Sequence, residues 1–269
     1  MRASSAFVEH DWYALPHYYD MVFDTDTKLE ADFLEQMRHL YGRSRGHRVL
    51  EPACGTGRLL KELARRGYRV SGFDRSPEML TYARQRLAAA HLPARLVQAD
   101  LAAFSLAAHF DLAHCLVSTF KYLRTEEEAR AHLRQVREAL TPGGLYVLGF
   151  HLTDYDTSAK IRERWVARRG ATRVICNIQT WPPRRKERLE QVRTRLVIEE
   201  QRQTRCFETH WDFRTYDAAE VRRLLRAVPG LELAAVYDFT YRLDRKRELT
   251  DDQLDTVLVL RKESLSSPR

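Results

Sequence analysis

Val49-Leu50-Glu51-Pro52-Ala53-Cys54-Gly55-Thr56-Gly57-Arg58-Leu59-Leu60 is the stretch of sequence that decides the fold. A short apolar run ends in an acid, a glycine-rich segment follows, and a helical pattern of apolar residues then begins. This order predicts a strand, a tight turn and a helix. Gly55 and Gly57 leave the main chain open to close approach, and the first amides of the helix face the same place. The stretch therefore predicts a ligand site at the carboxyl end of a buried strand.

The spacing of the glycines narrows the kind of ligand. A dinucleotide-binding turn has a third glycine three residues after the second, where this chain has Leu60. A phosphate-binding loop continues into Gly-Lys-Ser/Thr, which does not follow here. Glu51, at the end of the strand, can accept a hydrogen bond from an amino group or balance its charge. These features favour a cofactor that carries an amino acid.

The turn resembles the first motif of the class I S-adenosylmethionine (SAM)-dependent methyltransferases, acid-x-Gly-x-Gly-x-Gly, with Ala53 in place of the first glycine. The resemblance implies SAM as the cofactor. It also implies that the cofactor contacts the following residues of the turn: Glu51, Ala53, Cys54, Gly55 and Gly57.

A second landmark of that family follows at residues 73–80, Phe-Asp-Arg-Ser-Pro-Glu-Met-Leu. A carboxylate at the end of a second parallel strand can accept both ribose hydroxyls of an adenosine, which is the position of Asp74. The resemblance adds Arg75 to the cofactor site and implies that Met79 lies against the adenine. Ser76 is expected to cap the helix that starts there.

Further landmarks come in the expected order. The strand predicted at residues 95–101 ends in Asp100 and Leu101, which the resemblance places against the adenine amino group and ring, although a lone aspartate there could also cap a turn. Leu116, near the end of the next predicted strand, joins the expected cofactor site. The Pro-Gly-Gly at residues 142–144 matches the landmark before the fifth strand.

The segment after the fourth strand bears on the methyl acceptor. Enzymes that methylate amino groups of bases carry Asn/Asp-Pro-Pro-Tyr/Phe there, whereas residues 116–120 read Leu-Val-Ser-Thr-Phe. A Pro-Cys nucleophile is also missing, so Cys115 is expected to pack within a strand. Methylation of a nucleobase is therefore disfavoured.

The predicted fold is α/β, a Rossmann-like seven-stranded, mostly parallel sheet flanked by helices, with an antiparallel β insertion after strand five. We assign residues 1–150 to the SAM-binding core with an N-terminal lid, 151–215 to the insertion that covers the substrate, and 216–269 to the completion of the core sheet. Three insertion strands are expected where apolar residues alternate: 172–181, 189–201 and 204–213. In the lid, Tyr19 resembles a tyrosine that approaches the cofactor in small-molecule methyltransferases.

The bulk composition fits one sizeable core. The chain has 269 residues, a formal net charge of +8 and four scattered cysteines without metal-ligand spacing, so we expect free thiols and no metal site. The sequence shows no signal peptide or membrane span, which favours the cytoplasm. The positive charge permits nucleic acid as a partner, but the basic residues are spread over many elements, as on a solvated surface. The sequence shows no appended nucleic-acid module, which favours a small-molecule substrate. The oligomeric state stays open, and a dimer is compatible with the sequence.

Methyl transfer from a sulfonium is an in-line displacement, so the protein must align donor and acceptor and exclude water. Some acceptors also lose a proton. The candidate bases are His151, just past the fifth strand, and Asp154, Tyr155 and His210 in the insertion. The expected function is SAM-dependent methylation of a nitrogen or oxygen of a small molecule, resembling sugar-amine and glycine/sarcosine N-methyltransferases. The alternatives are an RNA or protein methyltransferase, or a SAM-binding module without turnover.

Overall fold

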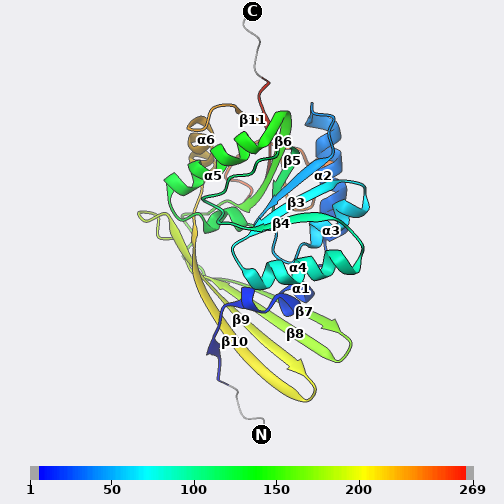
Figure 1. The fold of residues 1–269 in the computed structure, drawn as a ribbon. Helices are drawn as coiled ribbons and strands as arrows, with labels where there is room; N and C mark the ends of the chain where they lie inside the picture. Colours follow the sequence, from blue (N-terminus) through cyan, green and yellow to red (C-terminus); the bar gives the residue numbers. More distant parts are fainter. Residues whose placement is uncertain (1–5, 265–269) are drawn as a thin grey trace, which may run out of the picture.

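The computed structural model describes residues 6–264, and its centre is a seven-stranded sheet (Figure 1). The strand order is β11-β12-β6-β5-β2-β3-β4. The strands are β2 (Arg48–Pro52), β3 (Arg69–Asp74), β4 (Ala94–Gln98), β5 (Phe110–Cys115), β6 (Leu140–His151), β11 (Leu231–Tyr237) and β12 (Asp255–Lys262). Paired neighbours are parallel except at β12, which runs antiparallel to β11 and β6. The predicted Rossmann-like fold is confirmed.

Helices cover both faces of this sheet. The helices are α1 (Pro16–Phe23), α2 (Thr27–Tyr41), α3 (Arg58–Arg65), α4 (Pro77–Ala89), α5 (Glu126–Ala139) and α6 (Ala218–Arg226), with short 3-10 turns η1 (Trp12–Ala14), η2 (Thr119–Tyr122) and η3 (Leu243–Arg245). One core packs α5 and α6 against one face, and a second core packs α2 and α3 against the other. Successive residues of β6, such as Tyr146 and Val147, enter different cores, as strand alternation requires.

The insertion forms a second sheet, which we call the roof. Its order is β1-β10-β9-β8-β7, with β1 (Val8–Glu9), β7 (Ile161–Arg169), β8 (Thr172–Thr180), β9 (Leu189–Glu200) and β10 (Gln203–Arg214). The prediction of three insertion strands was wrong, because β7 is a fourth. Its sequence, Ile-Arg-Glu-Arg-Trp-Val-Ala-Arg-Arg, is an exposed edge strand without clear apolar alternation.

The N-terminal segment lies between the roof and the core. Its strand β1 pairs in parallel with β10, although sequence analysis grouped this segment with the core. Trp12, Met21 and Val22 pack against inward-facing roof residues in a third apolar cluster. The roof therefore rests on α1 and η1, and α1 in turn rests on the core.

The turn after β2 has left-handed backbone at three positions. The φ angles are +51° at Ala53, +50° at Gly55 and +68° at Gly57. A Cβ at Gly57 would lie 3.0 Å from the Cβ of Ala83 in α4, so this glycine also allows close helix packing. A Cβ at Gly55 would meet no atom within 4 Å. The turn thus leaves an open space beside the main chain.

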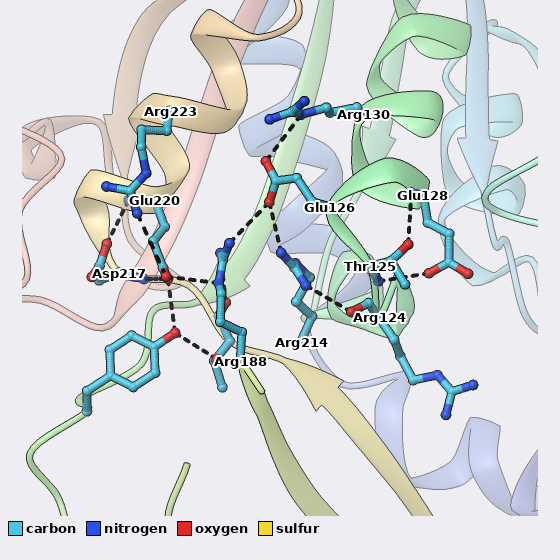
Figure 2. A network of polar contacts seen from close by, with 12 residues as sticks. Arg124, Thr125, Glu126, Glu128, Arg130, Arg188, Arg214, Asp217, Glu220 and Arg223 are labelled. Atoms are coloured by element: carbon cyan, nitrogen blue, oxygen red, sulfur yellow. Dashed lines mark hydrogen bonds and ion pairs between the residues drawn. The ribbon is translucent and has the colours of Figure 1, made fainter. Parts of the chain in front are cut away.

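An ion-pair network fastens one end of the roof to the core, as Figure 2 shows. Arg188, before β9, and Arg214, at the end of β10, both reach Glu126 at the start of α5, over 3.1 and 2.8 Å. Arg188 also contacts Glu220 in α6 over 2.9 Å, and the hydroxyl of Tyr155 donates to the same carboxylate over 3.0 Å. The network holds the roof against the first turns of two core helices.

Within residues 6–264, no helix is long and apolar enough to cross a membrane, and no group of three histidine, cysteine, aspartate or glutamate side chains could hold a metal ion. Cys54, Cys115 and Cys176 are buried free thiols, and Cys206 is a half-buried one.

We predict that Glu126→Gln destabilises the protein by about 1–3 kcal/mol, because it leaves the buried guanidinium of Arg214 without its carboxylate. Glu127→Gln is the matched control, since Glu127 is exposed in the same first helical turn and its replacement should change stability by about 0.5 kcal/mol or less. Urea unfolding followed by circular dichroism measures both. Equal effects of the two substitutions would contradict the role of the network.

Candidate functional site

Two adjoining hollows lie at the carboxyl edge of the core sheet. The first, which we call the groove, has a volume of about 60 Å³ and lies against the turn after β2. The second, which we call the chamber, has a volume of about 480 Å³ and lies under the roof. Tyr19, Phe23, Val117 and Thr119 line both hollows and so form the boundary between them.

The backbone at this boundary is strained. Val117 and Ser118 are consecutive non-glycine residues with φ of +57° and +64°. Such conformations cost about 1–3 kcal/mol each and gather at functional sites. The Ser118 side chain accepts a hydrogen bond from the amide of His151 over 3.2 Å, which ties the strained segment to the end of β6. The strain marks this segment as a candidate site.

The structure brings half of the predicted cofactor residues to the groove. The residues of that prediction that line it are Tyr19, Glu51, Ala53, Cys54, Gly55 and Leu116. The remaining six do not line it: Gly57, Asp74, Arg75, Met79, Asp100 and Leu101. Thr56 and Arg58 line the groove as well and were not predicted.

Asp74 fixes the turn. Its carboxylate accepts hydrogen bonds from the amides of Gly55, over 2.8 Å, and Ser76, over 2.9 Å. Burial raises the pKa of Asp74, and these two hydrogen bonds act in the opposite direction. The carboxylate therefore joins the ends of β2 and β3, and its further lone pairs can accept hydroxyl groups.

Two other predicted residues have structural roles. Met79 is fully buried, so its side chain is part of the core. Asp100 is exposed and accepts a hydrogen bond from the amide of Ala102 over 2.7 Å, which is a turn cap. Arg75 is also exposed at the surface. None of the three lines either hollow.

Glu51 lies in the groove with unusual surroundings. Its side chain is buried, and Oε2 has no hydrogen-bond partner. His114 on β5 lies behind it, with Nδ1 3.9 Å from Oε1 of Glu51 and both ring nitrogens unpartnered. Burial raises the pKa of Glu51 to about 8, and burial lowers that of His114 to about 3. Glu51 in the groove wall and His114 behind it are therefore two buried polar groups without hydrogen-bond partners, and burial favours the neutral form of each.

Arg58, the cation whose charge lowers the pKa of Glu51, is engaged elsewhere. Arg58 forms an ion pair with Glu30 in α2 and donates to Thr27 over 3.0 Å. Arg58 partly offsets the effect of burial on the pKa of Glu51. It does so without a direct hydrogen bond, so Glu51 is free to pair with a cation that enters the groove.

Aromatic side chains form much of the chamber wall. They come from the N-terminal segment, from η2 and from the roof: Trp12, Tyr13, Tyr19, Phe23, Tyr122, Trp165, Trp181, Trp211 and Phe213. Trp12 and Trp211 stack with ring centroids 5.2 Å apart, which joins the N-terminal segment to β10. Such a wall excludes water and suits flat or cationic groups.

The charged residues of the chamber are mostly acidic. Lys121 pairs with Glu190 over 2.6 Å, and both are buried. His151 Nδ1 lies 2.8 Å from Asp255 Oδ1. Two further acids, Asp154 and Glu163, line the chamber. The chamber is thus acidic in a protein whose formal charge is +8.

The predicted bases are only partly brought together. His151 and Asp154 line the chamber, but His210 does not. Since Trp211 points into the chamber, strand alternation turns His210 to the outer face of β10, where Nε2 pairs with Glu208 over 2.7 Å. The Tyr155 hydroxyl is engaged in the network of Figure 2. The placement of His210 in the site is corrected by this geometry.

Sequence reasoning missed Asp255, Lys121 and Glu190. Asp255 faces His151 because β12 pairs with β6 in a register that sets these two residues opposite each other. No short-range signal joins positions 104 residues apart. Asp255 lies within residues 216–269, which the sequence assigns to the completion of the core sheet, but nothing in the sequence pairs it with His151.

Comparison with known proteins agrees with this geometry. Residues 49–144 match the family model described as a methyltransferase domain. The chain is 36% identical over 100 residues to the dTDP-3-amino-3,4,6-trideoxy-alpha-D-glucopyranose N,N-dimethyltransferase of Streptomyces venezuelae, covering 37% of this chain and 40% of that protein. It is 31% identical over 128 residues to the glycine/sarcosine N-methyltransferase of Halorhodospira halochloris, covering 47% of each. The chain spans between 40% and 49% of the length of three of the curated relatives it matches, which is less than half.

Solved structures resemble nearly the whole chain. An S-adenosylmethionine-dependent methyltransferase from Clostridium acetobutylicum has a TM-score of 0.77 at 18% identity, covering 94% of this chain and 99% of that one. The SAM-bound amino pentose methyltransferase CalS10 from Micromonospora echinaspora has a TM-score of 0.69 at 22% identity, covering 96% and 99%. Residues 49–144 therefore match a methyltransferase domain, and the chain as a whole has the same fold as these solved structures.

Proposed function

We propose that this protein is an enzyme that transfers a methyl group from SAM to a nitrogen of a small amine. The observation that carries the proposal is the junction of the groove and the chamber at Tyr19, Phe23, Val117 and Thr119. A donor in the groove and an acceptor in the chamber would meet there. The volume of the chamber, about 480 Å³, suits a small molecule rather than a folded macromolecule.

The groove fits the amino-acid end of SAM. Glu51 offers a buried, unpartnered carboxyl oxygen for the ammonium group, and the open space at Gly55 admits a ligand against the main chain. Asp74 is proposed to accept the ribose hydroxyls from its position behind Gly55. When bound, SAM supplies an electrophilic methyl group on a sulfonium. The further cofactor residues proposed from the resemblance are Ala53, Cys54, Gly57, Arg75, Met79, Asp100, Leu101 and Leu116.

The charges of the chamber favour an amine. Lys121 is neutralised by Glu190, and His151 is held by Asp255, whereas Asp154 and Glu163 add negative charge. Together with the aromatic wall, these acids attract and hold a cation. The sugar and glycine/sarcosine relatives are named as N-methyltransferases, which supports nitrogen as the acceptor atom.

His151 is proposed as the base that takes a proton from the acceptor. The hydrogen bond from His151 holds the pKa of Asp255 below its usual value, so Asp255 stays ionised and accepts the Nδ1 proton. This leaves Nε2 as the acceptor nitrogen of the ring. Asp154 lines the same chamber and is a second candidate.

The direct test is incubation with methyl-labelled SAM and a panel of small amines, each paired with the alcohol of the same carbon skeleton. We expect the label in amines. Label only in the alcohols would overturn the amine assignment, and SAM binding without transfer to any member of either panel would count against an enzyme of this class.

We predict that SAM binding at pH 7 releases close to one proton. Burial raises the pKa of Glu51 to about 8, so the carboxyl is mostly protonated at pH 7 and must ionise to pair with an ammonium group. The affinity for SAM should therefore increase as the pH is raised from about 6 to 7.5. Calorimetry in buffers of different ionisation enthalpy measures the proton release, and a binding enthalpy independent of the buffer would refute this account.

Glu51→Gln is the companion variant. A raised carboxyl pKa lowers stability as pH rises from the unfolded value toward 8, because the unfolded chain ionises and the folded one does not. The variant removes this cost, so we expect it to melt at a higher temperature than the wild type at pH 8. It should also bind SAM more weakly and without proton release.

We predict that His151→Gln lowers kcat about 100-fold or more, as loss of a general base does, and leaves SAM affinity unchanged because His151 does not line the groove. His210→Gln is the matched control and should keep full activity, since His210 lies outside the chamber. Steady-state kinetics with an amine acceptor measure kcat of both variants. A similar decrease of kcat in both variants would contradict a role of His151 that depends on its position in the chamber.

A further inference from the structure

A buried carboxylate, Asp20, joins α1 to two elements of the core. Asp20 is 0% exposed, and its Oδ1 accepts a hydrogen bond from Thr56, in the turn after β2, over 3.0 Å. Its Oδ2 accepts from the hydroxyl of Tyr82 over 3.3 Å and forms an ion pair with Arg86, both in α4. Sequence analysis assigned a cofactor contact to the neighbouring Tyr19 and no role to Asp20.

Asp20 also reaches the roof. Arg169, at the end of β7, places Nη2 3.5 Å from Oδ2 of Asp20 and 3.9 Å from the carboxylate of Asp24. Arg169 is 46% exposed, so this contact is screened by solvent and is weaker than that of Arg86. Asp20 therefore joins the cofactor turn, α4 and the tip of the roof in one cluster.

The cluster resists displacement of α1. A fully buried carboxylate is costly unless a cation and hydrogen-bond donors compensate it. Rotating or shifting α1 would separate Asp20 from Thr56, Tyr82 and Arg86 at once, because the three donors come from fixed core elements. The position of α1 is therefore set by polar contacts as well as by its apolar packing.

The same helix carries two of the residues that separate the groove from the chamber. Tyr19 and Phe23 line both hollows, and their ring centroids are 4.6 Å apart. Trp12 packs edge-on against both rings, at 5.2 and 5.7 Å. A small shift of α1 would thus change the boundary between donor and acceptor.

We propose that Asp20 is a positioning residue for methyl transfer, acting through Thr56 and Arg86 to hold Tyr19 and Phe23 at the junction of the two hollows. This inference rests on the proposed function. In-line transfer needs the reacting atoms about 3–3.5 Å apart and aligned, so looser placement of α1 lowers the rate of transfer more than it lowers binding.

The test compares Asp20→Asn with Asp24→Asn. Asp24 ends the same helix and also approaches Arg169, but its side chain is 43% exposed and no hydrogen bond joins it to Thr56. The concentration of competent enzyme is taken from the stoichiometry of SAM binding, so a loss of folded protein does not count as a loss of rate. We expect kcat of Asp20→Asn to fall at least 10-fold with KM for the amine changed less than threefold, and Asp24→Asn to match the wild type.

Thr56→Val tests the route of the effect. If Asp20 acts through Thr56, the double variant should be no slower than Asp20→Asn alone. If the fold-losses in kcat of the two single variants multiply in the double variant, the two residues act independently, and the proposed route through Thr56 is overturned. An unchanged kcat in Asp20→Asn would overturn the proposal itself.

Hydrogen exchange of the amides of residues 17–23 in α1 gives a readout that needs no activity. We expect exchange to speed up at least 10-fold in Asp20→Asn and to stay at the wild-type rate in Asp24→Asn. If the wild type neither binds SAM nor transfers a methyl group, the proposed function fails. Unchanged exchange in Asp20→Asn would show that Asp20 does not hold α1, whatever the function is.

Discussion

The hydrogen bonds of the Asp74 carboxylate to the amides of Gly55 and Ser76 are the interaction on which the site depends. They hold the turn after β2 and the start of α4 in one arrangement, with left-handed backbone at Ala53, Gly55 and Gly57. Asp74 binds the Gly55 amide, and the space where a Cβ of residue 55 would stand contains no other atom within 4 Å. The turn is therefore held by Asp74 and open at Gly55. The groove, its boundary with the chamber and the contact of Thr56 with Asp20 all follow from this arrangement.

The site retains groups that a stable core would avoid. Glu51 and His114 are buried with unpartnered polar atoms, and burial moves the pKa of each toward its neutral form. Val117 and Ser118 adopt left-handed backbone without glycine. These features lower stability, and the large apolar cores on both faces of the sheet offset them. Their concentration at one edge of the sheet is the physical signature of a binding site.

Part of the core fold could be predicted from sequence, because some core strands end at a local signal. Glu51 and Asp74 lie at the ends of β2 and β3, where their residue types predicted strand ends, whereas the Pro-Gly-Gly at residues 142–144 lies inside β6 and not before it. The roof was harder to predict. Its edge strand β7 carries arginines on an exposed face, so the alternation of apolar and polar residues fails there. The pairing of β1 with β10 joins residues nearly 200 positions apart.

The site residues divide in the same way. Glu51 and Gly55 follow from the turn, whereas Asp255, Glu190 and Asp20 act through partners that only the tertiary structure brings near. His210 was predicted in the site but lies outside it, because a one-residue step along a strand moves a side chain to the other face of the sheet. Asp100 and Met79 were predicted from a motif; Asp100 caps a turn and Met79 is buried in the core, and their contact with the cofactor stays a prediction.

The most direct measurement is a crystal structure of the full chain with S-adenosylhomocysteine, the product that methyl transfer would leave. The account predicts its ammonium group at Glu51, its main body against Gly55 and its sulfur facing the boundary formed by Tyr19 and Val117. A product molecule bound elsewhere, or a groove without bound product at saturating ligand concentration, would contradict the account.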